Sequence, residues 1–279
     1  MTASRKLVLY AVALAVVLGI SMTVGWAAEP TGLANAEPAQ AEHGGAMGDE
    51  MVPGLASADA GYRLLADNDT IPANELTSYR FRIAGEDGVM TEFDVEHTKP
   101  MHLIVVRRDF AGFQHLHPDM DEGGTWHTEL ALAEPGTYRV FADFVIDGDK
   151  QTLATDLFVA GDFQPQPLPL PDHVADAGDD YTVEITGEAA AGQESTLDFV
   201  IRHQGDIVDD IPEYLGARGH LVALRDGDLA YLHVHADEVR LSFEAEFPTP
   251  GAYRLFLQFR HNGEVRTAAF TVNAKEDTR

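Results

Sequence analysis

The chain has 279 residues and a formal net charge of −27 at pH 7, because 46 acidic residues outnumber 19 basic ones. A surface of this charge repels phosphate, which excludes nucleic acid as an expected partner. The sequence contains no cysteine, so disulfides, zinc fingers, iron–sulfur clusters and the cysteine-ligated blue-copper centre are excluded as well.

The first 28 residues, 1–28, are expected to form a membrane anchor or signal segment. Arg5 and Lys6 precede an uncharged run over residues 7–26, which as a helix is long enough to cross a bilayer core of about 30 Å. Positive charges before the run place the N-terminus in the cytoplasm and the rest of the chain outside. We therefore expect a single-pass protein of the cell membrane with extracytoplasmic domains. Secretion after signal cleavage is the alternative.

Residues 29–58 are rich in Ala, Gly, Pro and acidic residues and show no apolar period, which predicts a flexible stalk. The stalk contains His43, Met47 and Met51. Their spacing would allow only loose copper binding, and we interpret it as chance.

Short alternating runs separated by turn residues follow the stalk, for example Tyr79–Ile83 and Leu255–Phe259. This pattern predicts an all-β fold. Residues 162–175 are dense in proline, which predicts a stiff, extended linker. We expect two tandem immunoglobulin-like β-sandwich domains, over residues 59–161 and 176–274.

An internal repeat relates the two halves. The segment from His102 to His117 aligns without a gap on the segment from His220 to His235, and each histidine moves by 118 positions. A Pro-Gly-x-Tyr-Arg sequence farther on recurs at an offset of 115. The two halves are therefore expected to be one duplicated domain. The two sets of histidines are His102, His115 and His117 in the first copy, and His220, His233 and His235 in the second.

The tyrosine of the Pro-Gly-x-Tyr step occurs as Tyr138 in the first copy and as Tyr253 in the second. A tight turn followed by such a tyrosine is typical of the tyrosine corner of immunoglobulin-like sandwiches, in which the hydroxyl group bonds back to the nearby backbone. We predict a structural role for both.

The histidine spacing predicts a metal site on a β-hairpin. An Asp-Gly pair at residues 226–227 favours a two-residue turn, and pairing outward from it sets Leu224 against Leu229 and His220 opposite His233. His235, two residues along, projects from the same face. The Cβ atoms of directly opposite residues lie about 5 Å apart, which is close enough for three imidazoles to converge on one ion. The repeat implies a second such site in the first copy, hence one three-histidine site in each domain.

Additional ligands are available near the first site. Met101 adjoins His102 but points to the opposite face if the strand is regular, while His97 lies on the approach and His127 follows the hairpin. Imidazole ligands without thiolate suit copper, zinc and nickel, and copper binds most tightly of these divalent ions. The nearby methionines favour copper as the metal, with zinc as the alternative. In a further interpretation the histidines are polar residues of a solvated sheet that titrate near neutral pH.

The two histidine segments also carry a resemblance. The sequences Asp94-Val-Glu-His-Thr-Lys-Pro-Met-His-Leu-Ile-Val-Val-Arg and Tyr214-Leu-Gly-Ala-Arg-Gly-His-Leu-Val-Ala-Leu-Arg, with the His-x-His pairs that follow them, resemble secreted or anchored bacterial proteins described as heavy-metal-associated. Proteins of that kind are often encoded beside copper-handling genes. The Pro-Gly-x-Tyr-Arg region is similar to the extracytoplasmic YtkA-like β-sandwich domains. The resemblance implies metal handling.

Three classes of function are therefore open. The first is extracytoplasmic copper buffering or delivery, with a metal-transport protein as partner. The second is a structural or adhesive tandem sandwich whose histidines are not ligands. The third, a metal-dependent enzyme, is not expected, because the sequence lacks the second cupin motif, an N-terminal histidine brace and any recognisable nucleophile motif.

Overall fold

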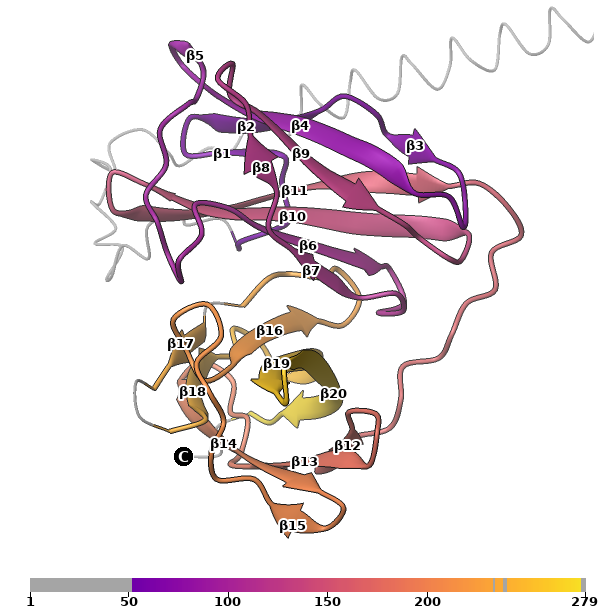
Figure 1. Cartoon of the computed structure of the whole chain (residues 1–279), viewed down its shortest axis with the longest axis vertical. Helices are drawn as coiled ribbons and strands as arrows, with labels where there is room; N and C mark the ends of the chain where they lie inside the picture. The colour runs from indigo at the N-terminus through magenta and orange to yellow at the C-terminus, as the bar shows by residue number, and fades with distance from the viewer. Residues whose placement is uncertain (1–51, 233, 238–239, 277–279) are drawn as a thin grey trace, which may run out of the picture. The chain divides into compact units, whose positions relative to one another are not determined.

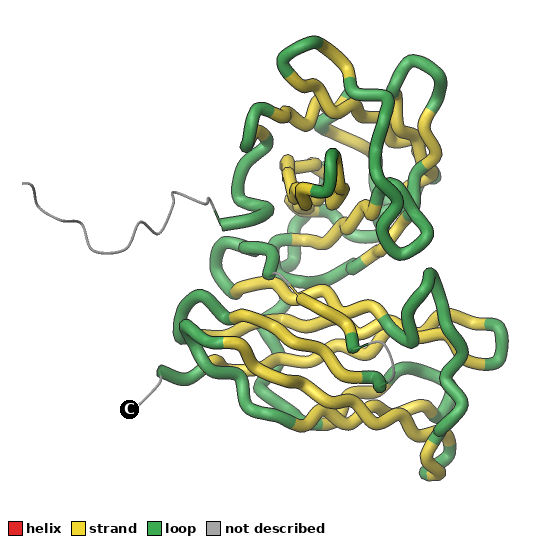
Figure 2. Tube along the Cα trace, turned by 90° about the vertical axis from the view of Figure 1, so that its left-hand side faces the viewer, coloured by secondary structure: helices red, strands yellow, loops and turns green. Residues whose placement is uncertain are grey.

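A computed structural model of the chain describes residues 52–232, 234–237 and 240–276. Within these ranges the regular structure consists of strands alone, as Figure 2 shows by its yellow and green tube. No helix in the described part combines the length and apolar character that a membrane span requires. The expected anchor, 1–28, and most of the expected stalk lie outside the described residues.

The first sandwich consists of two facing sheets (Figure 1). One has the strand order β1-β2-β4-β9-β8, with β5 paired to β4; the other has the order β3-β11-β10-β6-β7. The strands of the first sheet are β1 (Ala58–Asp59), β2 (Tyr62–Ala66), β4 (Thr77–Gly85), β5 (Gly88–Val89), β8 (Asp119–Met120) and β9 (Thr125–Leu130). Those of the second are β3 (Thr70–Ile71), β6 (His102–Arg107), β7 (Gln114–Leu116), β10 (Gly136–Ile146) and β11 (Asp149–Val159).

The second sandwich also has two sheets, of which the smaller has fewer strands than its counterpart in the first. Its larger sheet has the order β12-β13-β14-β18-β17, with β15 paired to β14, and its smaller sheet has the order β16-β19-β20. The larger sheet contains β12 (Val174–Asp176), β13 (Tyr181–Thr186), β14 (Glu194–His203), β15 (Asp206–Ile207), β17 (Val234–Ala236) and β18 (Ser242–Glu246). The smaller contains β16 (His220–Arg225), β19 (Gly251–His261) and β20 (Glu264–Ala274). The prediction of two tandem immunoglobulin-like sandwiches is confirmed.

Each sandwich has its own core, built from alternate residues of its strands. In β4 the inward residues Tyr79, Phe81 and Ile83 are at most 1% exposed, and Phe81 stacks against Trp126 of β9. The corresponding residues of the second core include Phe199 and Ile201 of β14. Alternation with period two is therefore what divides these strands into a core face and an outer face.

Strands β6 and β16 are buried on both of their faces. Leu103 and Val105 of β6 belong to the first core, whereas Ile104 and Val106 belong to a third cluster that also contains Val222 and Leu224 of β16. This interface cluster consists of Ile104, Val106, Phe110, Phe141, Ala154, Val222, Leu224, Leu229 and Phe256. Both sandwiches belong to one compact unit of the chain, and the interface cluster packs them together.

The tyrosine corner is present in both copies. The hydroxyl group of Tyr138 donates to the carbonyl oxygen of Glu134 at 2.9 Å, and that of Tyr253 donates to the carbonyl oxygen of Thr249 at 2.7 Å. Both rings are at most 1% exposed. The prediction of a structural role for the two tyrosines is confirmed.

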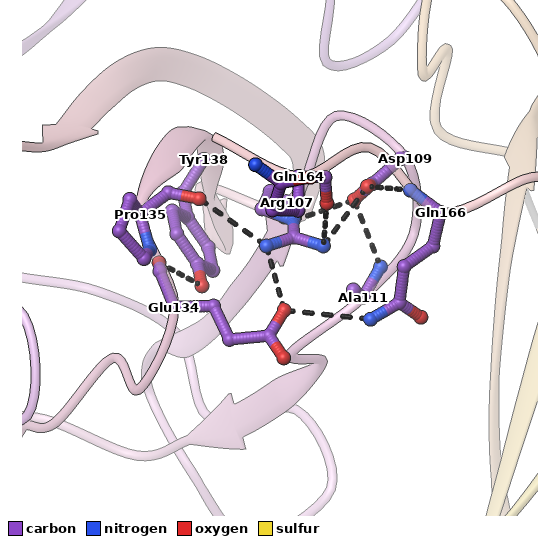
Figure 3. Close-up of polar contacts among 8 residues, drawn as sticks. All are labelled: Arg107, Asp109, Ala111, Glu134, Pro135, Tyr138, Gln164 and Gln166. Carbon is purple, nitrogen blue, oxygen red and sulfur yellow. Dashed lines mark hydrogen bonds and ion pairs between the residues drawn. The ribbon is translucent and has the colours of Figure 1, made fainter. Parts of the chain in front are cut away.

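The proline-rich linker lies against the first sandwich instead of acting as a free spacer. Arg107, 1% exposed, donates to the carbonyl oxygen of Gln164 at 3.4 Å, and the backbone N–H of Gln166 donates to Asp109 at 2.8 Å (Figure 3). Arg107 also lies over the ring of Phe163. An extended backbone leaves its own N–H and C=O groups without partners. The ion pair of Arg107 and Asp109 supplies a donor and an acceptor for these groups, and so holds the linker.

The described end of the expected stalk is likewise bonded to the sandwiches. The backbone N–H of Gly54 donates to the carbonyl of Thr152 in β11, and the carbonyl of Pro53 accepts from Tyr231 of the second copy. The guanidinium group of Arg139 donates to the carbonyls of Gly54 and Leu55. Residues 52–58 therefore join the fold through backbone hydrogen bonds to both copies.

Candidate metal centre

The hairpin that carries the histidines has a different register from the predicted one. In the first copy Ile104 pairs with His115 and Leu103 with Leu116; in the second, Leu224 pairs with Tyr231. Continuing the first register by one residue sets His102 opposite His117. The prediction that Leu224 faces Leu229 was wrong. At the offset of 118 the Leu224–Tyr231 bridge corresponds to Val106 and Phe113, which continues the register of the first copy. Farther along the two copies differ, because Val234 pairs with Ala245 of β18, whereas its counterpart Leu116 pairs with Leu103.

The wider loop explains the shift in register. In the second copy Arg225 pairs with Asp228, whose carboxylate also accepts from the backbone N–H of Ala230 at 3.1 Å. Leu229 takes a positive φ of 62° and buries its side chain in the interface cluster. An ion pair and a buried leucine therefore determine the loop, and they override the preference of Asp-Gly for a two-residue turn.

Three histidines of the first copy converge on the outer face of this hairpin. One ring nitrogen from each of His102, His115 and His117 lies within 4.8 Å of the others. The ring centroids are 5.3 Å apart for His102 and His115, 5.0 Å for His102 and His117, and 4.7 Å for His115 and His117. Imidazoles bind a metal at about 2.0–2.1 Å, which brings two ligand nitrogens of a tetrahedral site to about 3.3 Å from each other.

A backbone carbonyl holds the outer nitrogen of His102. Its Nε2 lies 3.1 Å from the carbonyl oxygen of Glu96, at the start of a turn in which His97 and Thr98 have φ values of 50° and 65°. Because a carbonyl oxygen only accepts, Nε2 carries the proton of the neutral ring. Nδ1 of His102 therefore presents its lone pair to the other two histidines.

Gln258 of the second sandwich holds the outer nitrogen of His115. Its amide nitrogen donates to Thr267 Oγ1 at 3.1 Å, which directs its oxygen toward His115 Nδ1 at 2.8 Å. Nδ1 of His115 donates this bond, and Nε2 is left with the lone pair. That Nε2 lies 3.0 Å from Nδ1 of His102.

Two lone pairs consequently face each other between His102 and His115. This contact is repulsive unless a proton or a metal cation lies between the two nitrogens. Nε2 of His117 adds a third buried nitrogen, and it has no hydrogen-bond partner among the described residues. Metal-ligating histidines characteristically donate their second ring N–H to a carbonyl or carboxylate, as His102 does to Glu96.

Burial makes a proton the less favourable occupant. Desolvation lowers the pKa of His102 and lowers that of His115 well below its usual value, in each case against weaker hydrogen-bond effects. Desolvation, followed by repulsion from the charged form of His102, lowers the pKa of His117 to about 4. All three rings are therefore neutral at pH 7, the state that binds metals.

The second copy contributes one histidine to the surroundings of this triad. His220 of β16, 8% exposed, lies with its ring 6.0 Å from that of His115 and 6.4 Å from that of His102. Its Nε2 lies 2.7 Å from the carbonyl oxygen of Tyr214, which repeats the bond of His102 to Glu96. Desolvation lowers the pKa of His220 to about 4.

The remaining predicted ligands lie elsewhere. Met101 is fully buried in the core of the first sandwich, on the face opposite His102, so its sulfur does not reach the triad. The ring of His97 lies 5.1 Å from that of His220 and 6.2 Å from that of His102, at the edge of the cluster. His235 is exposed on β17, which pairs with β18 in the other sheet, and His233 lies outside the described residues.

The sequence prediction missed the contribution of Gln258. It placed one site in each domain, whereas in the described part of the chain the one group of three potential ligands is the triad of the first copy, next to the second sandwich. The signal was the continuous apolar run of β6 and of β16. A strand of an antiparallel sheet that is apolar on both faces requires a partner on its outer face.

Comparisons with known proteins give only distant structural similarities. A crystal structure of Salmonella alpha-2-macroglobulin reacted with methylamine is similar over 79% of this chain, with 16% identity and a TM-score of 0.29, and this chain spans 15% of its length. The Escherichia coli adhesin FdeC is similar over 79% of the chain and 65% of its own, with 14% identity and a TM-score of 0.28. The BSP domain of a biofilm-associated protein is similar over 78% and 30%, with 9% identity and a TM-score of 0.26. No curated protein matches the sequence.

A match to a family model supports the two tandem domains that the resemblance implied. The match does not support a relation to heavy-metal-associated proteins or to YtkA-like domains. The match occurs twice, over residues 56–161 and over residues 174–276, so each sandwich is one copy of the same domain. The chain belongs to the family described as "Domain of unknown function (DUF8832)".

Proposed function

We propose that the chain binds one transition-metal ion through Nδ1 of His102, Nε2 of His115 and Nε2 of His117. The observation that carries the proposal is the pair of lone pairs 3.0 Å apart between His102 and His115, beside the unpartnered Nε2 of His117. A cation removes this repulsion and gives the third nitrogen a partner. Three imidazoles leave a fourth position for water or for an exchanging ligand.

The ligand set favours copper(II), with zinc as the alternative. Three imidazoles suit both metals, and copper binds more tightly at a given site. Met101 lies in the core, so the argument for copper from a nearby thioether no longer applies to this residue. With an open position and neutral ligands, the site suits reversible buffering, or delivery to a partner that handles the same ion.

The proposed location follows from the N-terminal sequence. A single anchor over residues 1–28 would place both sandwiches on the extracytoplasmic side of the membrane, where a site without cysteine avoids oxidation. The strongly acidic surface would attract cations toward the protein.

A specific observation favours a second candidate, a structural or adhesive tandem sandwich. His220 makes the same bond to a turn carbonyl as His102 does, although it lies outside the group of three potential ligands. A buried histidine at this position can therefore serve to hold the turn that precedes the strand.

Metal titration distinguishes the two candidates. Calorimetry of the full chain with Cu(II), and separately with Zn(II), is expected to show that the His115→Gln/His117→Gln variant loses one equivalent relative to the wild type. His127→Gln is the matched control, because His127 is exposed on β9 of the same sandwich, and it is expected to keep wild-type uptake. Equal uptake by the double variant and the wild type would reject the metal proposal in favour of the structural candidate.

A further inference from the structure

The metal centre lies on the outer face of β6 and β7, which the second sandwich covers. Phe113, just before β7, stacks on Phe256 of β19 with ring centroids 4.0 Å apart and an interplanar angle of 7°. Gln258 lies two residues farther along β19, so its side chain projects from the same face. The same packing that buries Phe256 therefore brings the amide of Gln258 to His115.

The repeat shows that this amide is not a requirement of the strand pair. Gln258 pairs in register with His220 of the second copy, and at the offset of 115 its counterpart in the first copy is Asp143, which pairs with His102. Each side chain bonds a threonine of the next strand, Thr267 or Thr152. Asp143 also has Lys150 nearby at 3.5 Å, whereas Gln258 directs its oxygen across the interface.

We infer that the second sandwich is a working part of the metal centre, in which Gln258 acts as a positioning residue. Its oxygen holds the proton of His115 on Nδ1 and thereby keeps the lone pair of Nε2 on the side where the ion binds. This inference rests on the proposed metal binding. It adds that the affinity for the ion depends on the docking of the two sandwiches, and by linkage that the bound ion strengthens the docking to the same extent.

Without Gln258, His115 can place its proton on either nitrogen and can turn about its side-chain torsions. In one tautomer the proton lies on Nε2 and blocks the ligand nitrogen. Metal binding must also fix the orientation of the ring, and the entropy lost in doing so weakens the affinity. Removing such a partner of a ligating histidine typically costs 10- to 100-fold in metal affinity. A loss on the order of 10-fold is expected here, because only one of the three ligands is affected.

Zinc titration of three full-chain variants tests the inference. Gln258→Leu removes the acceptor and is expected to bind Zn(II) about 10-fold more weakly than the wild type. Gln258→Glu keeps an acceptor oxygen and is expected to retain or exceed wild-type affinity. Arg260→Gln is the matched control, since Arg260 is exposed and lies two residues farther along the same strand; its affinity is expected to be unchanged.

Nitrogen-15 NMR of the metal-free chain gives an independent readout. The wild type and Gln258→Glu are expected to show His115 protonated on Nδ1, and Gln258→Leu a mixture of tautomers. Wild-type zinc affinity in Gln258→Leu would overturn the inference while leaving the proposed function in place. Weak binding by both Gln258→Leu and Gln258→Glu with an unchanged tautomer would overturn it as well, since packing alone would then be responsible. Uptake of neither Cu(II) nor Zn(II) by the wild type would overturn the proposed function and the inference together.

Discussion

At the scale of single residues, two tyrosine hydroxyl groups and two histidine rings on strands form hydrogen bonds to the backbone of the preceding turn. Tyr138 and Tyr253 bond a carbonyl four residues upstream, while His102 and His220 bond one six residues upstream. Each of these four buried side chains thus finds a backbone acceptor, which is the condition for burying a polar group without a large penalty. A buried histidine that serves a turn through one nitrogen still has its other nitrogen available for a ligand.

The tyrosine corners can be tested singly and together. Tyr253→Phe removes the bond to Thr249 and is expected to lower the free energy of unfolding by about 1 kcal/mol; Tyr138→Phe is expected to act similarly on the bond to Glu134. Because the two corners lie in different sandwiches, the double variant is expected to show the sum. Urea unfolding measures all three. An unchanged unfolding midpoint in both single variants would contradict a stabilising role.

At the scale of elements, Arg107 at the end of β6 both stabilises the loop that follows and holds the linker. Arg107 pairs with Asp109 and with Glu134 and also holds the linker through the carbonyl of Gln164. The equivalent arginine of the second copy, Arg225, pairs with Asp228 within its own loop. The ion pair therefore belongs to the repeat, and its contact with the linker is specific to the first copy.

Replacing this arginine tests the element directly. Arg107→Met leaves Asp109 without its buried partner, so a loss of about 3 kcal/mol in unfolding free energy is expected. The adjacent Arg108→Met is the control: Arg108 is 40% exposed in its ion pair with Asp156, and surface pairs contribute about 1 kcal/mol or less. Denaturant unfolding compares the two, and equal losses would show that Arg107 contributes no more than a surface charge.

The strands and the duplication could be predicted from the sequence, because alternation and the shared offset of 118 are local patterns. The register of the hairpin could not be predicted from the sequence. Its loop is determined by the Arg225–Asp228 ion pair and by the burial of Leu229, and the sequence preferences of two-residue turns take neither into account. The triad survived this error because a shift of two residues preserves the face of a strand. The role of Gln258 was beyond local patterns, for it is 143 positions from His115.

At the scale of the whole molecule, the two copies bury neutral histidines where they meet. His102, His115 and His220 contact one another across the two sandwiches or bond the turns before β6 and β16, and His117 packs against His102 and His115. The nearby charged groups include Glu96 and Asp143, which are both bonded or close to Lys150, and Lys99, whose charge also acts on His117. Protonating any of the four rings therefore places a charge in a region whose acids are already neutralised.

The stability of the fold should consequently fall as the pH falls through the histidine range. The folded pKa values of His117 and His220 are about 4, against 6.5 in the unfolded chain, so below pH 6.5 the unfolded state binds more protons and is favoured. The decrease in the free energy of unfolding begins near pH 6.5 and ends near pH 4.

The melting temperature of the metal-free chain is expected to fall between pH 7 and pH 5, before most carboxylates titrate, and the fall should be smaller in His117→Gln. Bound Zn(II) competes with the protons and should move the fall to lower pH. A melting temperature that stays constant from pH 7 to pH 5 would contradict this burial of neutral histidines, whether or not the site binds a metal.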